Sequence, residues 1–198
     1  MTGSSDFAAL ERPVLEAAPL LLGAVLRHDG VAVRITEVEA YGGADDPGSH
    51  AAAGLTPRSR VMFGPAGRLY VFLSYGMNFC ANVVTGPEGS ASAVLLRAGE
   101  VIEGLEVAQR RRGTKVEKEL TRGPGKLCSA LNIRLKENRA DLSTGPVRLE
   151  LGEPIDPELI SSGPRVGLTN GADLPWRFWI TGDPTVSVYR PARPARRG

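Results

Sequence analysis

Residues 31–50, VAVRITEVEAYGGADDPGSH, constrain the fold more than any other segment. The first half alternates with the two-residue period of a β-strand. The side chains expected on one face of that strand are Val31, Val33, Ile35, Glu37, Glu39 and Tyr41. An inward face that changes from apolar residues to carboxylates and an aromatic ring predicts a pocket at the rim of the core. The alternative is a strand end that has reached solvent, with hydrated glutamates.

Composition is typical of a globular protein. The chain has 198 residues, 42% hydrophobic and 23% charged, which suits a single domain with a sizeable core. The net charge of +2 does not by itself predict a nucleic-acid partner. With Cys80 and Cys128 as its two cysteines, the sequence offers neither a disulfide framework nor a usual zinc-ligand set, so we expect reduced, partly buried thiols and no metal.

The first 30 residues and the hydropathy pattern predict where in the cell the protein is found. Residues 1–30 lack the charge and hydrophobicity pattern of a signal peptide, and the apolar run 17–26 is too short to span a bilayer. We therefore expect a cytoplasmic protein that does not bind membranes. Residues 1–5 and the Arg- and Pro-rich residues 191–198 are expected to be disordered.

Residues 69–85, LYVFLSYGMNFCANVVT, predict a β-hairpin with Gly76 and Asn78 in its turn. Its tip carries Tyr75 and Met77, whereas hairpin tips are normally polar. Large apolar side chains at this position suggest a wedge or a contact surface. The alternative is a tip that folds back onto the core.

Three further features concern charge. Residues 92–98, SAVLLRA, predict a buried strand whose lone charge, Arg97, needs a carboxylate or phosphate partner. Residues 123–133, GPGKLCSALNI, predict a glycine-rich loop that leads into a short helix, where backbone amides and Lys126 could contact a phosphate. This loop is not a Walker A motif. Arg58 and Arg60 have a spacing that suits adjacent phosphates.

Taken together, these segments resemble the alkyladenine (3-methyladenine or N-methylpurine) DNA glycosylase family. The matching motifs are ITEVEAYGGADDPGSH, TPRSRVMF, LYVFLSYGMNFCANVVT, AVLLRA, LTRGPGKLCSALNI, RVGL and WRFWI. They follow one another in the family's order from about residue 17 to 188. The combination E-A-Y, a histidine nine residues after the tyrosine, and Y-G-M is highly specific.

The resemblance implies roles for particular residues. It places the general base that activates water at Glu39 and an arginine near that water and the target phosphate at Arg97. Walls of the purine pocket would be Tyr41, His50 and Phe72, and Asn82 would exclude guanine. In the resemblance, the DNA contacts fall on Tyr75, Arg58 and Lys126. Met77, the second large apolar residue of the hairpin tip, is expected to contact DNA with them. Phe72 stands where vertebrate members carry a pocket tyrosine, so the stacking ring is kept and a hydroxyl is lost. Asn78 replaces an aromatic residue near the hairpin tip. Both departures affect lesion range more than the reaction.

The expected protein is therefore a monofunctional DNA glycosylase that starts base excision repair. It would flip alkylated or deaminated purines, hypoxanthine among them, out of duplex DNA and hydrolyse the N-glycosidic bond without a cofactor. We expect one mixed α/β (α+β) domain over residues 1–198, a curved antiparallel β-sheet with surrounding helices and a protruding β-hairpin, acting as a monomer. A non-catalytic damaged-DNA-binding protein is the main alternative.

A second alternative is a sugar glycosidase that uses Glu37 and Glu39 as a pair. Two residues apart on a strand, they would be separated by about 6.6 Å, within the range of inverting carboxylates. Both would point from the same wall, however, whereas an acid and a base must flank the bond.

Overall fold

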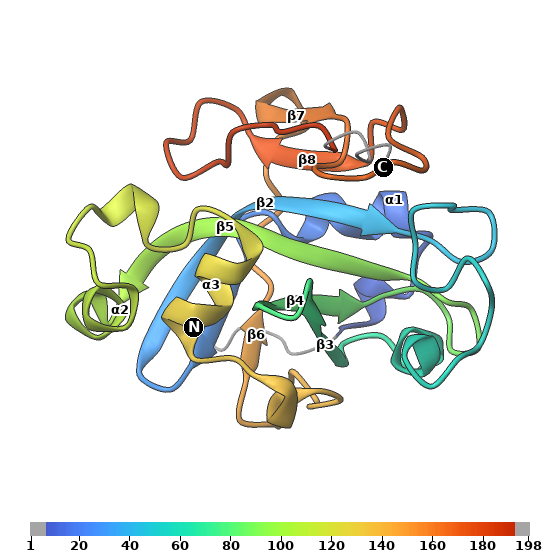
Figure 1. Ribbon diagram of the computed structural model, residues 1–198, viewed down its shortest axis with the longest axis horizontal. Helices are drawn as coiled ribbons and strands as arrows, with labels where there is room; N and C mark the ends of the chain where they lie inside the picture. Colours follow the sequence, from blue (N-terminus) through green and yellow to red (C-terminus); the bar gives the residue numbers. More distant parts are fainter. Residues whose placement is uncertain (1–6, 193–198) are drawn as a thin grey trace, which may run out of the picture.

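The computed structural model describes residues 7–192 (Figure 1). The expectation of disorder for residues 1–5 and 191–198 falls, apart from residues 191 and 192, outside the described residues. Among those that are described, no helix has both the length and the apolar character needed to cross a membrane.

A curved antiparallel sheet forms the centre of the molecule. The strands within residues 7–192 are β1 (Val25–His28), β2 (Val31–Tyr41), β3 (Leu69–Ser74), β4 (Asn78–Val84), β5 (Ala93–Glu103), β6 (Arg148–Glu150), β7 (Ile160–Gly163) and β8 (Arg177–Ile180). Their order is β3-β4-β5-β2-β1-β6, and β8 pairs with both β2 and β7. The mixed α/β fold expected from the sequence is confirmed.

Strand β2 is the central strand of this sheet. One edge pairs with β5 along its length, and the other edge pairs first with β1 and then, at Glu37 to Glu39, with β8. The long, crossing β2 and β5 are visible in the middle of Figure 1. From Val31 to Ala40 every residue except Arg34 is buried. The glutamates of β2 are thus not hydrated residues at an exposed strand end.

The alternation of β2 is interrupted at Glu37. Its register with β5 shifts on both sides of this residue, as at a β-bulge. The β2 residues that pack into the main core are Val31, Val33, Ile35, Val38 and Ala40. The expectation of one face from Val31 to Tyr41 is therefore wrong beyond Ile35, because the shift turns Glu37 and Glu39 away from the main core.

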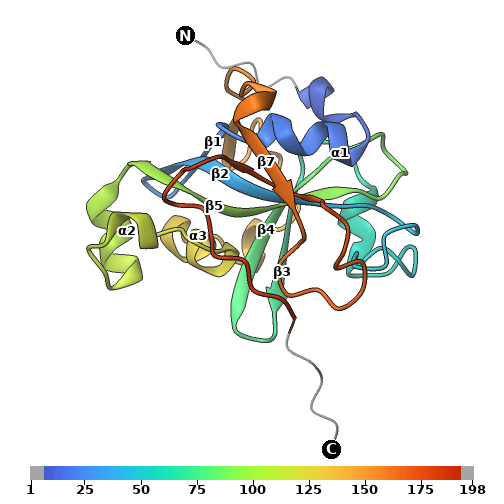
Figure 2. The same cartoon turned by 90° about the horizontal axis from the view of Figure 1, so that it is seen from above.

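Helices pack beside the sheet. The α-helices are α1 (Val14–Ala17), α2 (Leu105–Arg112) and α3 (Pro124–Leu131). The short 3₁₀ helices are η1 (Phe7–Leu10), η2 (Ala18–Leu21), η3 (Ser59–Phe63), η4 (Glu117–Glu119), η5 (Leu135–Glu137) and η6 (Pro157–Leu159). Helix α3 contacts β4, β5 and α2. Figure 2 shows α2 and α3 on one side of the long strands, away from α1.

The hairpin of β3 and β4 extends beyond the sheet (Figure 2). Its turn begins at Tyr75, whose φ of 48° and that of Gly76, 68°, lie in the left-handed region. Tyr75 is 88% and Met77 is 76% exposed. The tip therefore does not fold back onto the core, and two large apolar side chains face solvent.

Candidate active site

A pocket with a volume of about 580 Å³ opens on the side of β2 that carries Glu39. Its walls come from β2, the β3–β4 hairpin, β5 and the loop of residues 164–176. The predicted site residues that line it are Glu39, Tyr41, His50, Arg58, Phe72, Tyr75, Asn82 and Arg97. Met77 lies beyond the pocket on the exposed tip, and Lys126 lines a separate hollow.

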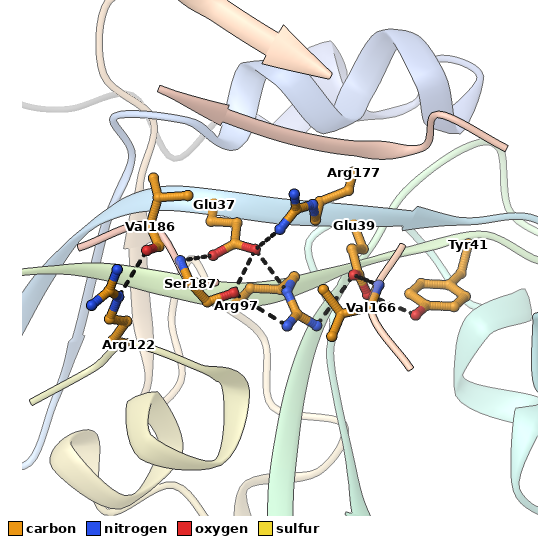
Figure 3. Close-up of polar contacts among 9 residues, drawn as sticks. All are labelled: Glu37, Glu39, Tyr41, Arg97, Arg122, Val166, Arg177, Val186 and Ser187. Carbon is orange, nitrogen blue, oxygen red and sulfur yellow. Dashed lines mark hydrogen bonds and ion pairs between the residues drawn. The ribbon is translucent and has the colours of Figure 1, made fainter. Parts of the chain in front are cut away.

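Glu39 is fully buried and held by three donors (Figure 3). Its Oε1 accepts the backbone N–H of Val166 at 2.7 Å and lies 3.2 Å from Nη1 of Arg97. Its Oε2 accepts the hydroxyl of Tyr41 at 2.8 Å. A carboxylate with this number of fixed partners is held in one orientation, which suits a catalytic group.

Arg97 joins the two glutamates of β2. Its Nε donates to Oε1 of Glu37 at 2.9 Å, while Nη1 faces Glu39. Burial lowers the pKa of Arg97, but the charges of Glu39 and Glu37 outweigh burial and raise it above its usual value. The expectation that Arg97 needs a carboxylate partner is confirmed, and it has two.

Glu37 itself does not line the pocket. Its carboxylate is occupied by Arg97, Arg177 and Ser187. Glu37 and Glu39 therefore do not flank a common substrate as the paired carboxylates of a sugar glycosidase must.

Aromatic rings form another part of the pocket wall. His50 and Phe72 meet edge to face with ring centroids 4.6 Å apart, and Tyr70 contacts both rings. The Tyr70 hydroxyl lies 3.0 Å from Nδ1 of His50, and Arg58 lies over the face of Phe72. Burial, with the nearby positive charge of Arg58, lowers the pKa of His50 to about 4. His50 is consequently neutral near pH 7 and can act as a hydrogen-bonding wall.

Two further polar side chains, Asn82 and Cys80, lie beside these rings in the pocket. Asn82 is buried and donates from Nδ2 to the backbone carbonyl of Tyr70, which leaves its Oδ1 available on the pocket side of β4. Cys80 also lines the pocket, and burial raises the pKa of its thiol to about 11. It is therefore a protonated thiol rather than a nucleophile. Cys80 and Cys128 are both buried and free, as predicted.

The ring of Tyr41 packs against a buried, charged side chain. The guanidinium of Arg165 lies over its ring at 4.7 Å and pairs with Asp46. Burial, followed by the negative charge of Glu39, raises the pKa of Tyr41 well above its usual value. The hydroxyl therefore stays protonated and donates to Glu39.

Lys126 lies at the start of α3, in a smaller hollow of about 260 Å³. Arg97 and Val166 line both hollows, so this one adjoins the main pocket. Nζ of Lys126 lies 2.8 Å from Glu119, which also pairs with Arg122. Hydrogen bonds from these two cations lower the pKa of Glu119 to about 2.

Several residues in or beside the pocket were not anticipated from the sequence. Tyr70 and Val166 line the main pocket and Ser187 lines the smaller hollow, whereas Asp46 and Arg165 lie outside both and support Tyr41. The alternation of β3 contained a signal for Tyr70, because it lies two residues before Phe72 and so on the same face. The others lie in loops, where no periodicity indicates which side chains turn inward.

The pocket suits a planar heterocycle, because several aromatic side chains line it. One oriented carboxylate suits the activation of water. These features, together with a large exposed hairpin tip, are those expected of a hydrolase that releases a base from a nucleic acid. The sequence model of the Methylpurine-DNA glycosylase (MPG) family matches residues 8–184 of this chain. The chain therefore belongs to this family.

Bacterial relatives agree with this assignment. A Nocardia farcinica protein is 54% identical over 182 residues, which cover 88% of this chain and 86% of the relative. A Streptomyces avermitilis protein is 52% identical over 195 residues, which cover 94% and 92%. Both are provisionally named 3-methyladenine DNA glycosylases. The present protein is thus a DNA glycosylase of the methylpurine type, a DNA-repair hydrolase of the N-glycosidic bond, and its substrate is DNA.

Proposed function

We propose that the protein flips an alkylated or deaminated purine out of duplex DNA into the 580 Å³ pocket and hydrolyses its N-glycosidic bond with water activated by Glu39. Acting as a monomer in the cytoplasm, it would start base excision repair. The lesions we propose are hypoxanthine and 3-methyladenine, and the second of these bases appears in the names of the relatives. The observation that carries the proposal is the arrangement of donors around Glu39.

A carboxylate has about four acceptor positions. Three positions of Glu39 face Val166, Arg97 and Tyr41, and these partners leave one on Oε2. Since Glu39 lines the pocket, a water molecule can occupy that position and donate to the carboxylate. The water oxygen then bonds to the anomeric carbon, the bond from carbon to purine nitrogen breaks, and the released proton goes to Glu39.

The leaving group determines how much further help is needed. An alkylated purine is already cationic and leaves as a neutral base, so one carboxylate is sufficient. The neutral imidazole of His50 supports this substrate, because it places no positive charge against the cationic ring. Stacking on Tyr41 and Phe72 would contribute roughly 1–3 kcal/mol per base, against an unstacking cost of a few kcal/mol.

The exposed tip and the basic residues supply the DNA contacts. We assign Tyr75 and Met77 to the minor groove, where Tyr75 fills the space that the flipped nucleotide leaves. Arg58, at the pocket rim, and Lys126, in the adjoining hollow, would contact phosphates on either side of it. Asn82, which lines the pocket, would exclude guanine through the exocyclic amino group of that base and so favour other purines.

The experiment is single-turnover excision from a duplex with one alkylated adenine, comparing wild type with Glu39→Gln. Removal of a general base is expected to slow release roughly 10²–10⁴-fold while lesion binding persists. Glu88→Gln is the matched control, because Glu88 is exposed and does not line the pocket.

The same experiment tests the non-catalytic alternative. If the protein is a damage sensor, the wild-type protein would bind the lesion but would not release the damaged base. A Glu39→Gln rate equal to that of wild type would show that Glu39 is structural and that the site is wrongly assigned.

A further inference from the structure

Glu37 is a fully buried carboxylate with no access to the pocket. Its Oε1 accepts from Nε of Arg97 at 2.9 Å, and its Oε2 accepts the backbone N–H of Ser187 at 2.6 Å. The Ser187 hydroxyl donates to Oε1 at 2.8 Å, and Nη1 of Arg177 lies 3.2 Å from the same oxygen. A buried carboxylate is costly to remove from water, and this one is satisfied by the hydrogen bonds from Arg97, Arg177 and Ser187. Because the substrate cannot reach it, Glu37 needs a role other than contact with DNA.

The guanidinium of Arg97 is divided among three partners. Nε bonds to Glu37, Nη1 faces Glu39, and Nη2 lies 3.4 Å from Oγ of Ser187 (Figure 3). Arginine and a carboxylate ordinarily prefer a bidentate pair in which two N–H groups contact both oxygens. The contact between Arg97 and Glu39 instead joins Nη1 to Oε1, and no bidentate hydrogen-bonded pair is present between these two residues.

We propose that Glu37 and Ser187 are positioning residues that hold Arg97 end-on against Glu39 and so keep the acceptor position of Oε2 open for the attacking water. The inference rests on the proposed function of Glu39. Without the anchor at Nε, Arg97 is free to rotate into a bidentate pair with Glu39. That pair would occupy the position from which Glu39 takes the proton of water.

The segment that carries Ser187 is fastened to the site at several points. Asp183 pairs with Arg34, and Oγ1 of Thr185 lies 2.7 Å from Oγ1 of Thr36. The backbone carbonyl of Val186 accepts from Nε of Arg122 at 2.8 Å, also drawn in Figure 3. These contacts fix the backbone, so removal of the Ser187 hydroxyl alone leaves the segment in place.

Ser187→Ala is therefore the sharpest test. It removes the hydroxyl between Glu37 and Arg97 but keeps the backbone N–H. We expect single-turnover release of an alkylated adenine to slow roughly tenfold, the size expected for a lost hydrogen bond to a charged group, with lesion affinity unchanged. Ser187→Thr, which retains a hydroxyl, is expected to restore the rate.

Two further variants complete the design. Ser161→Ala removes an exposed hydroxyl that bonds to Thr181, and it serves as the matched control with wild-type rate. Glu37→Gln is expected to slow release roughly a hundredfold, the effect of a misplaced catalytic group. If Glu37→Gln does not fold, the Ser187 variants still decide the question.

The proposal is overturned if Ser187→Ala keeps the wild-type rate, if rate and affinity fall together, or if threonine does not restore the rate. Glu39→Gln is measured in the same assay. An inactive Glu39→Gln beside a fully active Ser187→Ala rejects the positioning role and leaves the proposed function standing. A Glu39→Gln as fast as wild type rejects the proposed function itself.

Discussion

Asp46 and Arg165 form a bidentate ion pair in which both side chains are fully buried and both N–O distances are 2.7 Å. Asp46 lies in the loop after β2, and Arg165 lies in the loop between β7 and β8. The pair therefore ties together two loops that border the pocket, and it places Arg165 behind the ring of Tyr41.

Removal of one charge from this pair is expected to be costly. Asp46→Asn leaves the guanidinium of Arg165 buried without a counter-charge, so we expect a loss of about 3–5 kcal/mol in the free energy of unfolding. Urea denaturation measures this loss. Asp173→Asn, at an exposed residue, is the control and should stay within about 0.5 kcal/mol of wild type. A loss below about 1 kcal/mol for Asp46→Asn would contradict the importance of the pair.

Tyr75→Ala tests the hairpin tip. Because Tyr75 is 88% exposed, we expect the free energy of unfolding to change by less than about 0.5 kcal/mol. Affinity for a lesion-containing duplex is expected to fall roughly 5- to 150-fold, as for a lost aromatic stacking partner of a base. Tyr75→Phe keeps the ring and should retain affinity, and Leu159→Ala controls for loss of an exposed apolar side chain. Unchanged lesion affinity in Tyr75→Ala would exclude a wedge.

Lys126→Ala tests the phosphate contact in the smaller hollow. Binding to damaged and undamaged duplexes is expected to weaken alike, and the slope of log affinity against log salt should decrease by about 0.9. Fluorescence anisotropy at several salt concentrations measures this slope. Lys115→Ala, at an exposed lysine outside the hollow, is the control. A slope equal to that of wild type would show that Lys126 serves only its pair with Glu119.

His50 predicts a pH dependence of stability. Its pKa of about 4 lies below the usual 6.5 because of burial and the charge of Arg58. Between these values the unfolded chain binds more protons, so the free energy of unfolding falls as the pH falls from 6.5 towards 4. One such group contributes at most about 1.4 kcal/mol per pH unit.

His50→Gln should remove this contribution, so its stability curve should diverge from that of wild type across this interval. Chemical denaturation at steps between pH 4 and 7 measures the difference. Parallel curves for the two proteins would show that His50 is not shielded as the pocket geometry implies.

Local sequence pattern indicated much of the architecture. Alternating residues predicted β2 and the β3–β4 hairpin, and the glycine-rich segment predicted α3, because strands and helices follow short-range periodicity and turn chemistry. Where the periodicity broke, the prediction failed. The bulge at Glu37 depends on pairing with β5, a partner some 60 residues away in the chain.

The sequence by itself indicated the central strand, the exposed hairpin and, through the family resemblance, many of the residues that line the pocket. Only the tertiary structure decided that Glu37 is separated from the pocket while Glu39 faces it. It also decided that Arg165 and Ser187 support the site from loops distant in the chain. The physical reason is that the segments that pack together determine which side chains are buried and which charges pair. Loop residues follow no periodic pattern from which their partners could be predicted.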